Sequence, residues 1–416
     1  PANGAVGDDD TINGGTGNEW VIGSVGADEI NLGTGGGIVL GDNGRIESDA
    51  AGLLVRVETI ESAIGASDSV TAGDGATIVF GGAAGDEIST AGGDDVIAGD
   101  MAVLTFNTGV RSVFESVIED PAFGGPDTVS TGAGDDWVIL GEGDDTSTSA
   151  SGLNIVIGDA GRIEAEGTTG IYNRVESTQP STGGNDSITG FVAGDSVVGG
   201  DGEDTIFGGD GNDTIDGGYG SDRLGGQDGD DTIFGGFDSR DEGGVIVPAL
   251  QSTDTITGGE GNDTIYIWGG DGTADGEAGE DDLILVTGPA SLTGGGGDDD
   301  FFVLANVTDD QLTEATIEDF NPFSDTLTLT VDHVPDGGTL PAVDVTMTQT
   351  TVDGVNGVMV EAVYTGSGDI PADFEGAVAF LKGVQVGDLD ASNVSVVSTA
   401  EADLFDAEAT MASIAP

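Results

Sequence analysis

The most regular alternation of apolar and polar positions lies between residues 199 and 234. One large apolar residue recurs there every nine positions, at Ile206, Ile215, Leu224 and Ile233, with glycines, aspartates and other polar residues between. Each of these residues fits a very short strand that points one side chain inward. The glycines around it allow turns with positive φ. We therefore expect two nine-residue units to form one coil of a flattened helix, so that turns eighteen residues apart stack.

The nine-residue units share more than their apolar position. They read GGDGEDTIF, GGDGNDTID, GGYGSDRLG and GQDGDDTIF, which is the pattern G-G-x-G-x-D-x-U-x with U a large apolar residue. Four tandem matches at fixed spacing resemble the RTX (repeats-in-toxin) family of calcium-binding β-rolls. The resemblance implies a parallel β-roll with Ca²⁺ bound in its turns, and type I secretion directed by an uncleaved C-terminal signal.

The same frame runs through the first 180 residues, where it is interrupted three times. Blocks of units end at Gly41, Gly99 and Gly158, which are 58 and 59 residues apart. An excursion follows each block and carries an arginine, then Val or Phe, then Glu, in residues 54–62, 109–119 and 172–181. Residues 1–180 are therefore predicted to be three super-repeats, each a β-roll block plus an excursion, here called an arm. Whether the blocks form one continuous roll or several is open at this stage.

The rest of the chain divides into two further regions. In residues 181–303 the units run unbroken to Phe234, pass an insert near residues 237–250 and resume to Phe302. Alternate turns at Gly272 and Ala290 lack the aspartate, so we expect one edge of the roll to bind Ca²⁺ there and the other not. Residues 304–416 are predicted to be a β-rich cap and secretion-signal region, because TIEDFNPFSDTLTLT (316–330) resembles the segment that closes the β-roll in serralysin-type proteases. Strands are expected near residues 343–350, 357–364, 377–381 and 394–398, and a frayed tail after them.

Composition narrows the function. The chain has 78 acidic against 8 basic residues, a formal net charge of −70, and no cysteine. Such a chain repels nucleic acid and anionic membranes, disulfides cannot stabilise it, and it contains no apolar run long enough for a membrane span. Divalent cations are an effective means of offsetting the self-repulsion. Calcium sites of millimolar affinity fill only outside the cell, which favours a secreted protein, with cytosolic location as the alternative.

The aspartates at position six of the units are the candidate calcium ligands. Pairs at i and i+18 offer two carboxylates plus turn carbonyls, an all-oxygen shell suited to Ca²⁺ rather than Zn²⁺. The alternative is that these are ordinary solvated Asp-Gly turns. The nine pairs are Asp10/Asp28, Asp68/Asp86, Asp127/Asp145, Asp186/Asp204, Asp195/Asp213, Asp204/Asp222, Asp213/Asp231, Asp263/Asp281 and Asp281/Asp299. Three further aspartates occupy the same position in the frame, Asp95, Asp136 and Asp254, and Asp136 is half-matched with Asn154.

The arms and the aromatic residues leave two interpretations open. Most arginines lie in or just before the arms, which predicts that the arms fold back and pair these arginines with the acidic roll; binding of a partner by the arms is the alternative. Outward positions of the units carry the rings of Trp20, Trp137, Phe80, Phe207 and Phe234. We expect either the arms and loops or another molecule to cover them.

No catalytic motif is present. The chain lacks HExxH and G-x-S-x-G, and its single histidine, His333, has no neighbouring metal-ligand spacing. We therefore predict a non-enzymatic, secreted structural protein that binds several Ca²⁺ ions, folds outside the cell and self-associates into a surface layer, filament or matrix. A cell-surface polysaccharide or matrix is a candidate partner. The alternatives are a folding and export cassette or fragment of a larger RTX adhesin or enzyme, and a ligand-binding module on an outer sheet face.

Overall fold

The computed structural model describes residues 7–60, 64–117, 124–165, 172–178, 183–236, 239–241, 246–248, 253–268, 270, 272–306, 313–332, 343–364, 377–390 and 392–399. The chain forms two compact units, which divide between Thr214 and Ile215. Apart from one short 3-10 turn, Val386–Asp388, all regular elements in the described residues are β-strands. This confirms the predicted all-β solenoid. His333 and residues 400–416 lie outside the described part.

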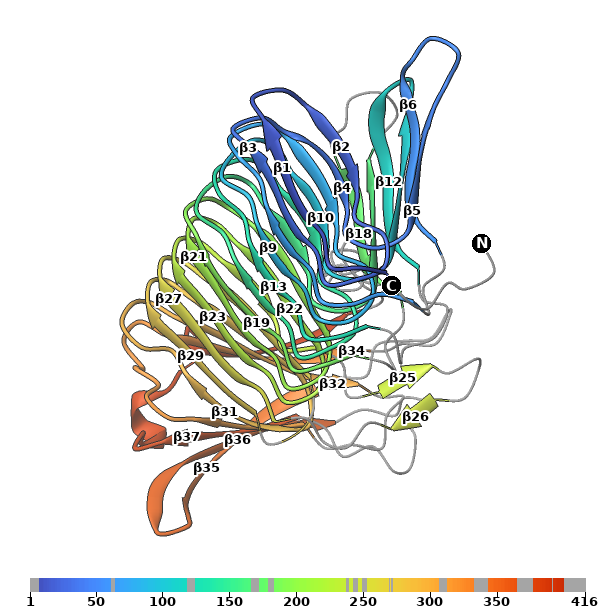
Figure 1. Ribbon diagram of the computed structural model, residues 1–416. Helices are drawn as coiled ribbons and strands as arrows, with labels where there is room; N and C mark the ends of the chain where they lie inside the picture. The colour runs from blue at the N-terminus through green and yellow to red at the C-terminus, as the bar shows by residue number, and fades with distance from the viewer. Residues whose placement is uncertain are drawn as a thin grey trace. The chain divides into compact units, whose positions relative to one another are not determined.

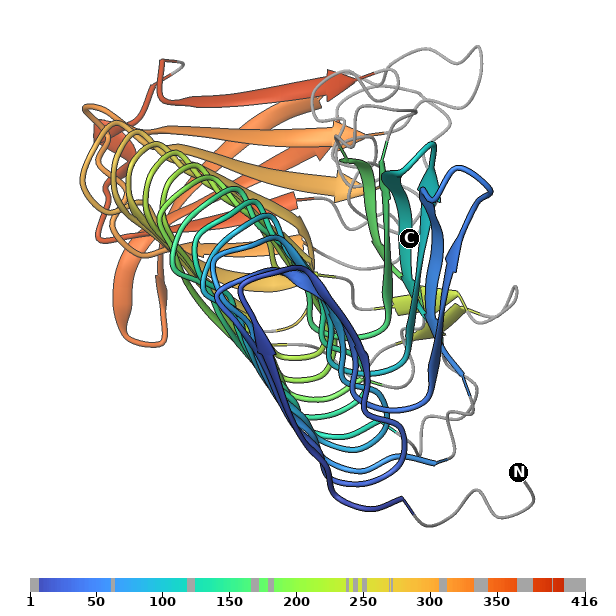
Figure 2. The same cartoon turned by 45° about the horizontal axis from the view of Figure 1, so that its top comes forward.

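In the first unit the strands alternate between two parallel sheets, here sheet A and sheet B. Successive strands of each sheet belong to successive coils, which Figures 1 and 2 show stacked from β1 to β21. Sheet A is ordered β1 (Thr11–Gly15), β3 (Glu29–Gly33), β7 (Ser69–Thr71), β9 (Glu87–Ser89), β13 (Thr128–Ser130), β15 (Thr146–Thr148), β19 (Ser187–Phe191) and β21 (Thr205–Asp210). Sheet B is ordered β2 (Glu19–Ile22), β4 (Gly37–Leu40), β8 (Thr77–Phe80), β10 (Val96–Ala98), β14 (Trp137–Ile139), β16 (Ile155–Ile157) and β20 (Ser196–Asp201).

The inner core of this unit is built from the apolar residue of each nine-residue unit. Ile30, Val70 and Ile88 stack in register in sheet A, and Val39, Val79 and Ile97 do so in sheet B. All six are at most 1% exposed. Because each short strand contributes one such side chain, the core is one residue deep per sheet and grows only by adding coils.

The outer faces of the two sheets differ in polarity. Sheet A presents Thr, Ser and Glu outward, as in TVS and EIS. Sheet B is apolar on both faces, as in GIVL, TIVF and WVI, and is fully buried over much of its length. An exposed apolar sheet face of this size requires a cover.

The cover is an antiparallel sheet, here the arm sheet, made by the three arms. Its strand order is β18 (Tyr172–Ser177), β17 (Gly161–Ala165), β12 (Val110–Ser116), β11 (Ala102–Asn107), β6 (Leu54–Thr59) and β5 (Gly44–Ser48). Its buried face and the outer face of sheet B form a second hydrophobic core, in which Phe114 stacks on Phe80 with ring centroids 5.8 Å apart. Figure 1 shows β5, β6 and β12 standing beside the sheet B strands. The arms therefore fold back as predicted, and they cover Phe80 and Trp137, which are 0% and 3% exposed.

In the first unit the three blocks form one continuous roll rather than several, an alternative that the sequence left open. Each arm leaves after a sheet B strand, and the chain then returns to sheet A in the next coil. Thus β3 pairs with β7, β9 with β13 and β15 with β19, all in parallel. The arm is an insertion in a turn, because the coil resumes in register on both sides of it.

The second unit is also built from two sheets. One is ordered β23 (Arg223–Asp228), β27 (Thr255–Glu260), β29 (Gly272–Ala278), β31 (Pro289–Thr293), β33 (Thr313–Ile317), β37 (Ala377–Lys382), β36 (Val355–Tyr364) and β35 (Val343–Val352). The other is ordered β22 (Thr214–Tyr219), β24 (Thr232–Phe234), β28 (Thr264–Trp268), β30 (Asp282–Thr287), β32 (Asp300–Asn306), β34 (Thr326–Asp332) and β38 (Val394–Thr399). The insert after Phe234 contains a short antiparallel pair, β25 (Ser239–Asp241) and β26 (Ile246–Pro248).

The solenoid runs beyond the boundary that the nine-residue pattern indicates. After Phe302 the chain adds one more coil, in which β33 pairs with β31 and β34 pairs with β32 in parallel. Only then do β37 and β38 add to the two sheets, and the antiparallel hairpin β35–β36 ends one of them. The segment 316–330 is therefore part of a coil rather than only a lid over the last coil.

Candidate metal sites in the turns

The candidate ligands line the turns that lead into the strands. All predicted aspartates except Asp10, which is exposed, are at most 3% exposed. In each described pair the backbone N–H of one aspartate donates to Oδ1 of the aspartate in the next coil. In the first unit, five of the predicted i, i+18 pairs make this contact, with N to Oδ1 distances of 2.7–2.8 Å. They are Asp10/Asp28, Asp68/Asp86, Asp127/Asp145, Asp186/Asp204 and Asp195/Asp213. The pairs Asp263/Asp281 and Asp281/Asp299 make it at 2.9 and 3.2 Å.

The second carboxylate oxygen of many of these aspartates has no protein partner. Within the described residues, Oδ2 is buried and accepts no hydrogen bond in Asp28, Asp68, Asp86, Asp127, Asp145, Asp186, Asp263 and Asp281. Burial of a charged oxygen without a partner costs several kcal/mol or forces the group to take up a proton. A bound cation removes that cost, so these oxygens indicate where an ion belongs.

Glycine at position one of a unit leaves room beside most of these oxygens. A Cβ atom on Gly81 would lie 2.1 Å from Asp86 Oδ2 and 2.4 Å from the carbonyl oxygen of Gly99. A Cβ on Gly276 would lie 2.4 Å from Asp281 Oδ2 and 2.6 Å from the carbonyl oxygen of Gly294. Carboxylate and carbonyl oxygens from successive coils therefore converge beside a bare Cα. This donor set is all oxygen and suits Ca²⁺.

Burial raises the pKa of several of these aspartates well above the value of an exposed carboxyl. It is the largest effect on Asp86, whose pKa rises to about 9, and on Asp127, where the charges of Asp100 and Asp86 add to it and the pKa rises to about 10. In the second unit burial raises the pKa of Asp263 to about 6. Without a cation, many turn carboxyls of the first unit would thus hold protons at neutral pH. A divalent ion keeps them ionised instead.

Comparison with known proteins identifies the repeat. The family model of the RTX calcium-binding nonapeptide repeat matches residues 5–39, 71–101, 122–156, 181–206, 189–224, 207–239 and 251–283. The chain is an RTX-repeat protein. RTX repeats bind Ca²⁺ and are typical of secreted proteins. In the described residues, no helix has the length and hydropathy that a membrane crossing needs.

Two further comparisons add little. Among solved structures, the extracellular lipase LipA from Serratia marcescens gives a match that covers 58% of this chain and 44% of the lipase. The sequence identity is 16% and the TM-score is 0.17. The match thus spans less than half of the lipase, and its activity is not carried over to this chain. No curated protein matches the chain.

The structure brings together RTX aspartates that the i, i+18 rule leaves apart. Across the arms, Asp28 pairs with Asp68, Asp86 with Asp127 and Asp145 with Asp186, at 2.6–2.9 Å and separations of 40 or 41 residues. Asp95 pairs with Asp136 in the same way on the other edge, and Asn154 pairs with Asp136 and Asp195. Asp222 and Asp231 pair with Asp254 and Asp263 across the insert, 32 residues on. The sequence contains these positions, but their spacing depends on how long each insertion is.

One further residue of the ladder was missed entirely. Asp325 is 3% exposed, and its Oδ1 accepts the backbone N–H of Asp299 at 3.3 Å. It lies 26 residues after Asp299, outside the nine-residue pattern. The strand TLTLT, which directly follows Asp325, could have indicated this residue. Its first residue, Thr326, pairs with Asp300 in the sheet, and Asp300 pairs in the same way with Asp282 of the preceding coil. The predicted pairs Asp204/Asp222 and Asp213/Asp231 join residues of different units and stay predictions.

The two edges of the second unit differ as the sequence indicates. At the positions of the missing aspartates, Gly272 and Ala290 pair with each other in the sheet and offer no carboxylate. The opposite edge carries Asp263, Asp281, Asp299 and Asp325. Among the described residues no three Asp, Glu, His or Cys side chains converge on a metal position. Each candidate site therefore combines at most two carboxylates with main-chain oxygens.

The expected pairing of arm arginines with the acidic roll is wrong for most of them. Arg45 and Arg56 form ion pairs with Glu58, Arg162 with Glu115 and Glu164, and Arg174 with Glu176, all within the arm sheet. The reason is local, because neighbouring antiparallel strands place Arg45 opposite Glu58 and Arg162 opposite Glu115. Arg111 is the exception: its guanidinium lies 4.5 Å from the centre of the Trp137 ring and donates to the carbonyl oxygens of Asp95 and Asp135.

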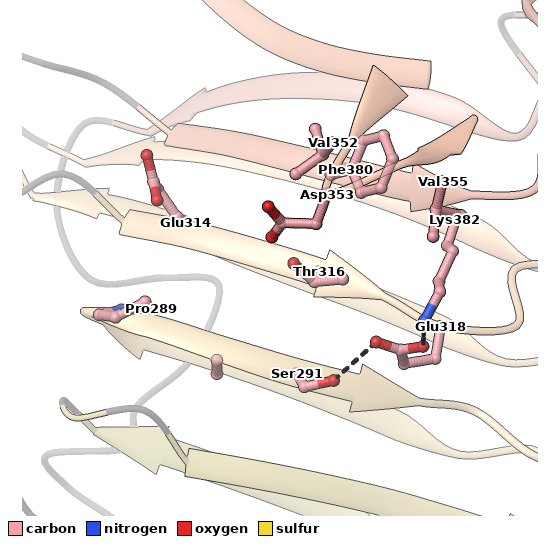
Figure 3. Close-up of a pocket in the computed structure, with 11 residues that line it drawn as sticks. Pro289, Ser291, Glu314, Thr316, Glu318, Val352, Asp353, Val355, Phe380 and Lys382 are labelled. Carbon is pink, nitrogen blue, oxygen red and sulfur yellow. Dashed lines mark hydrogen bonds and ion pairs between the residues drawn. The ribbon is translucent and has the colours of Figure 1, made fainter. Parts of the chain in front are cut away.

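A pocket in the second unit gathers other polar side chains. It has a volume of about 380 Å³ and lies between β31, β33, β37 and the tip of the β35–β36 hairpin (Figure 3). Glu318 accepts a hydrogen bond from Ser291 Oγ at 3.2 Å and forms an ion pair with Lys382. This arrangement ties three strands together and leaves Glu314 and Asp353 as the other acidic groups on its wall.

Proposed function

We propose that this RTX-repeat protein is a non-enzymatic structural protein, which folds when it meets extracellular Ca²⁺ and then assembles into a layer, filament or matrix. The observation that carries the proposal is the ladder of buried carboxylates whose Oδ2 atoms accept no hydrogen bond. The ladder occupies turn after turn, so Ca²⁺ acts on the whole solenoid and not on one local site.

The charge of the chain makes folding depend on cations. A net charge of −70 opposes compaction, and the inner core has one apolar side chain per short strand. Cytosolic calcium is too low to fill sites of millimolar affinity, whereas extracellular calcium fills them. The free energy of ion binding then becomes free energy of folding, because the unfolded chain has no preformed site.

Assembly is supported by the first coil of the first unit. Within the described residues, β1 and β2 each have a neighbouring strand on one side only. Trp20 and Ile22 of β2 are 56% and 43% exposed, whereas the equivalent residues Ile38 and Leu40 of β4 are buried. An exposed apolar surface of this kind is a candidate site for contact with another chain. We propose a second copy as the occupant, in a contact that propagates.

Calcium titration followed by sedimentation tests the proposal. Far-UV circular dichroism should change from coil to β on addition of millimolar Ca²⁺, with Mg²⁺ much less effective, and sedimentation should then show large oligomers. Trp20→Glu should shift them toward monomers, while Val192→Glu, at another exposed apolar residue, should not. A β spectrum in excess chelator as strong as that in Ca²⁺ would refute calcium-dependent folding. A calcium-folded monomer at tens of micromolar would refute assembly and favour an export cassette.

A further inference from the structure

Three of the turns that lead into strands of sheet B, here the sheet B turns, begin with a hydroxyl residue. These residues are Thr90, Thr131 and Ser149, at position one of the units that end in β10, β14 and β16. The RTX pattern has glycine at this position, as at Gly81 in a turn that leads into sheet A. A hydroxyl group here is therefore a departure from the repeat, and it recurs in three successive coils.

The hydroxyl groups of the two threonines lie beside the aspartate of their own turn. Burial, the largest effect, raises the pKa of Asp95 to about 7, and a hydrogen bond from Thr90 acts against this rise. Burial likewise raises the pKa of Asp136, and a hydrogen bond from Thr131 acts against it. In the described residues neither hydroxyl group has another hydrogen-bond partner, and both threonines are at most 5% exposed. Each buried hydroxyl group therefore has the carboxylate as its acceptor.

Threonine at position one also fills the space that glycine leaves open. Beside Gly81, a Cβ would lie 2.1 Å from Asp86 Oδ2 and 2.4 Å from the carbonyl oxygen of Gly99. These are the oxygens that converge where an ion would bind in a turn that leads into sheet A. In the turns of Thr90 and Thr131, the same position of the repeat carries a Cβ and a hydroxyl group.

The backbone supplies a second donor to each of the two aspartates. Asp95 Oδ1 accepts the N–H of Thr77 at 2.7 Å, and Asp136 Oδ1 accepts that of Asp95 at 2.8 Å. Together with the hydroxyl group of its own turn, each carboxylate therefore has two hydrogen-bond donors from the protein.

The neighbouring sheet B turns contribute no carboxylate at position six. Thr77 and Asn154 occupy that position before and after the two aspartates. Asn154 Nδ2 donates to the carbonyl oxygen of Gly152 at 3.1 Å. Over the same coils, the turns that lead into sheet A carry Asp68, Asp86, Asp127 and Asp145. The sheet A side therefore offers more position-six carboxylates to ions than the sheet B side.

The second arm adds a fixed positive charge to these turns. Arg111 of β12 donates to the carbonyl oxygens of Asp95 and Asp135, both at 3.4 Å, and lies 4.5 Å from the centre of the Trp137 ring. Burial raises the pKa of Asp136, and the charge of Arg111 acts against that rise. The acidic groups whose charges act on the guanidinium are Asp94, Asp95, Asp135 and Asp136. These turns therefore already contain a cation that belongs to the protein.

We propose that the sheet B turns at Asp95 and Asp136 bind no Ca²⁺. Thr90, Thr131 and Arg111 specify this exclusion. The hydroxyl groups hydrogen-bond the carboxylates and fill the ion position, and the guanidinium supplies the opposite charge that a buried carboxylate needs. In these coils the ions then lie on the sheet A side, and the second arm acts as an attached counter-ion on the other side. The inference rests on the calcium-dependent folding proposed above.

Asparagine substitutions test whether these turns hold ions. In Asp95→Asn and Asp136→Asn the amide oxygen still accepts the backbone N–H, while the charge is lost. Asp86→Asn is the matched variant on the sheet A side. Equilibrium dialysis of the full chain against Ca²⁺ counts the ions bound. We expect the parent number in Asp95→Asn and Asp136→Asn, and at least one ion fewer in Asp86→Asn.

The possible results separate the inference from the proposed function. A loss of ions in Asp95→Asn or Asp136→Asn equal to that in Asp86→Asn would overturn the inference. If the parent chain does not fold on addition of Ca²⁺, or Asp86→Asn binds the parent number, it is the proposed function that fails.

A conversion variant tests the three residues that specify the exclusion. Thr90→Gly, Thr131→Gly and Arg111→Gln together give the two turns the bare position one of the sheet A side and remove the guanidinium. We expect this variant to bind at least one ion more than the parent. The same substitutions at Thr128, Thr146 and Arg174 are the control and should leave the number unchanged. A parent number in the conversion variant would show that these residues do not exclude the ion.

A measurement on the unmodified chain covers the case in which a variant does not fold. Anomalous scattering from crystals grown in Ca²⁺ should show peaks beside Asp86 and Asp127, and none beside Asp95 or Asp136. A peak beside either of the last two would overturn the inference.

Discussion

The coils of the first unit and the coils between Thr255 and Asp332 of the second are closed in different ways. In the first unit both edges carry buried aspartates, such as Asp86 and Asp127 on one and Asp95 and Asp136 on the other. Several of its strands are three residues long. In the later coils one edge has lost its aspartates, and β30, β32 and β34 are six or seven residues long. Each of these three strands buries two apolar side chains two residues apart, Leu283 and Leu285, Phe301 and Val303, and Leu327 and Leu329.

The difference shows two means of holding a solenoid coil. Where each short strand adds one inner side chain, we propose that ions in the turns supply further stability, and the arms add a second core outside the roll. Where the strands lengthen and the core deepens, one row of carboxylates is dispensable, because about 25 cal/mol is gained per Å² of apolar surface buried. The two parts of the chain should therefore respond differently to the loss of metal.

The largest expected effect is on removal of Ca²⁺. In excess chelator we expect the amides of the first-unit strands to exchange at nearly the rate of an unfolded chain, because folding would then require each buried carboxyl either to take up a proton or to stay charged without a partner. The amides of β32 and β34 should keep measurable protection, since their core does not depend on the missing row. Hydrogen exchange with mass spectrometry reads both regions in one sample. Equal loss of protection in the two would contradict the comparison.

A pH change without calcium should come next in size. Asp86 and Asp127 have folded pKa values of about 9 and about 10, against about 3.9 for an exposed aspartate. A raised folded pKa means that the folded form binds protons more tightly, so its stabilising contribution is complete below about pH 4. That contribution is lost as the pH rises from there through the folded pKa.

Asp263 and Asp299 have folded pKa values of about 6. The stabilising contribution of their protons is therefore completely lost at a lower pH than that of Asp86 and Asp127. In chelator, the β signal of the first unit should thus be partly restored at pH 5 relative to pH 8, and the second unit should change less. Circular dichroism together with local hydrogen exchange measures this. A first unit that is less ordered at pH 5 than at pH 8 would reverse the sign and exclude the explanation.

Truncation of the deeper core should have a moderate effect that does not depend on metal. Phe301 is fully buried and lies 6.0 Å from Phe320 between ring centroids. Phe301→Ala should cost the second unit about 3–5 kcal/mol, whether or not Ca²⁺ is present. Denaturant unfolding followed by exchange of the β32 and β34 amides measures the loss, and Phe301→Leu, which leaves a smaller cavity, should cost less. An effect that appears only in chelator would show that these coils, too, depend on ions.

The smallest effect is expected from the ion pairs on the arm sheet. Arg174 pairs with Glu176, and the side chain of Arg174 is 45% exposed. Arg174→Ala should cost about 0–1 kcal/mol, because exposed pairs gain little in water. Phe114→Ala, in the core beneath the same sheet, provides the contrast and should cost about 3–5 kcal/mol. Calcium-dependent unfolding monitored by Trp fluorescence compares the two, and a large loss for Arg174→Ala would mean that charge rather than apolar packing holds the arms.

Much of the arrangement could be read from local pattern. The nine-residue period predicts the coil, its inward side chains such as Ile206 and Ile265, and the aspartates that face the turns, because each unit is a local structure repeated in register. The outward rings of Phe80 and Trp137 correctly called for a cover. The arginine partners were mispredicted, since composition shows only that arginines and acids coexist, whereas strand pairing decides that Arg45 meets Glu58.

The sequence by itself determined the type of coil and its candidate ligands, because these follow from residues a few positions apart. The tertiary structure alone decided which aspartates meet across 26 to 41 residues, as Asp86 meets Asp127 and Asp299 meets Asp325. It also decided that the three arms form one sheet over sheet B. The physical reason is that an insertion in a turn changes the spacing along the chain but not the register of the coils, and register is set by the backbone hydrogen bonds between them.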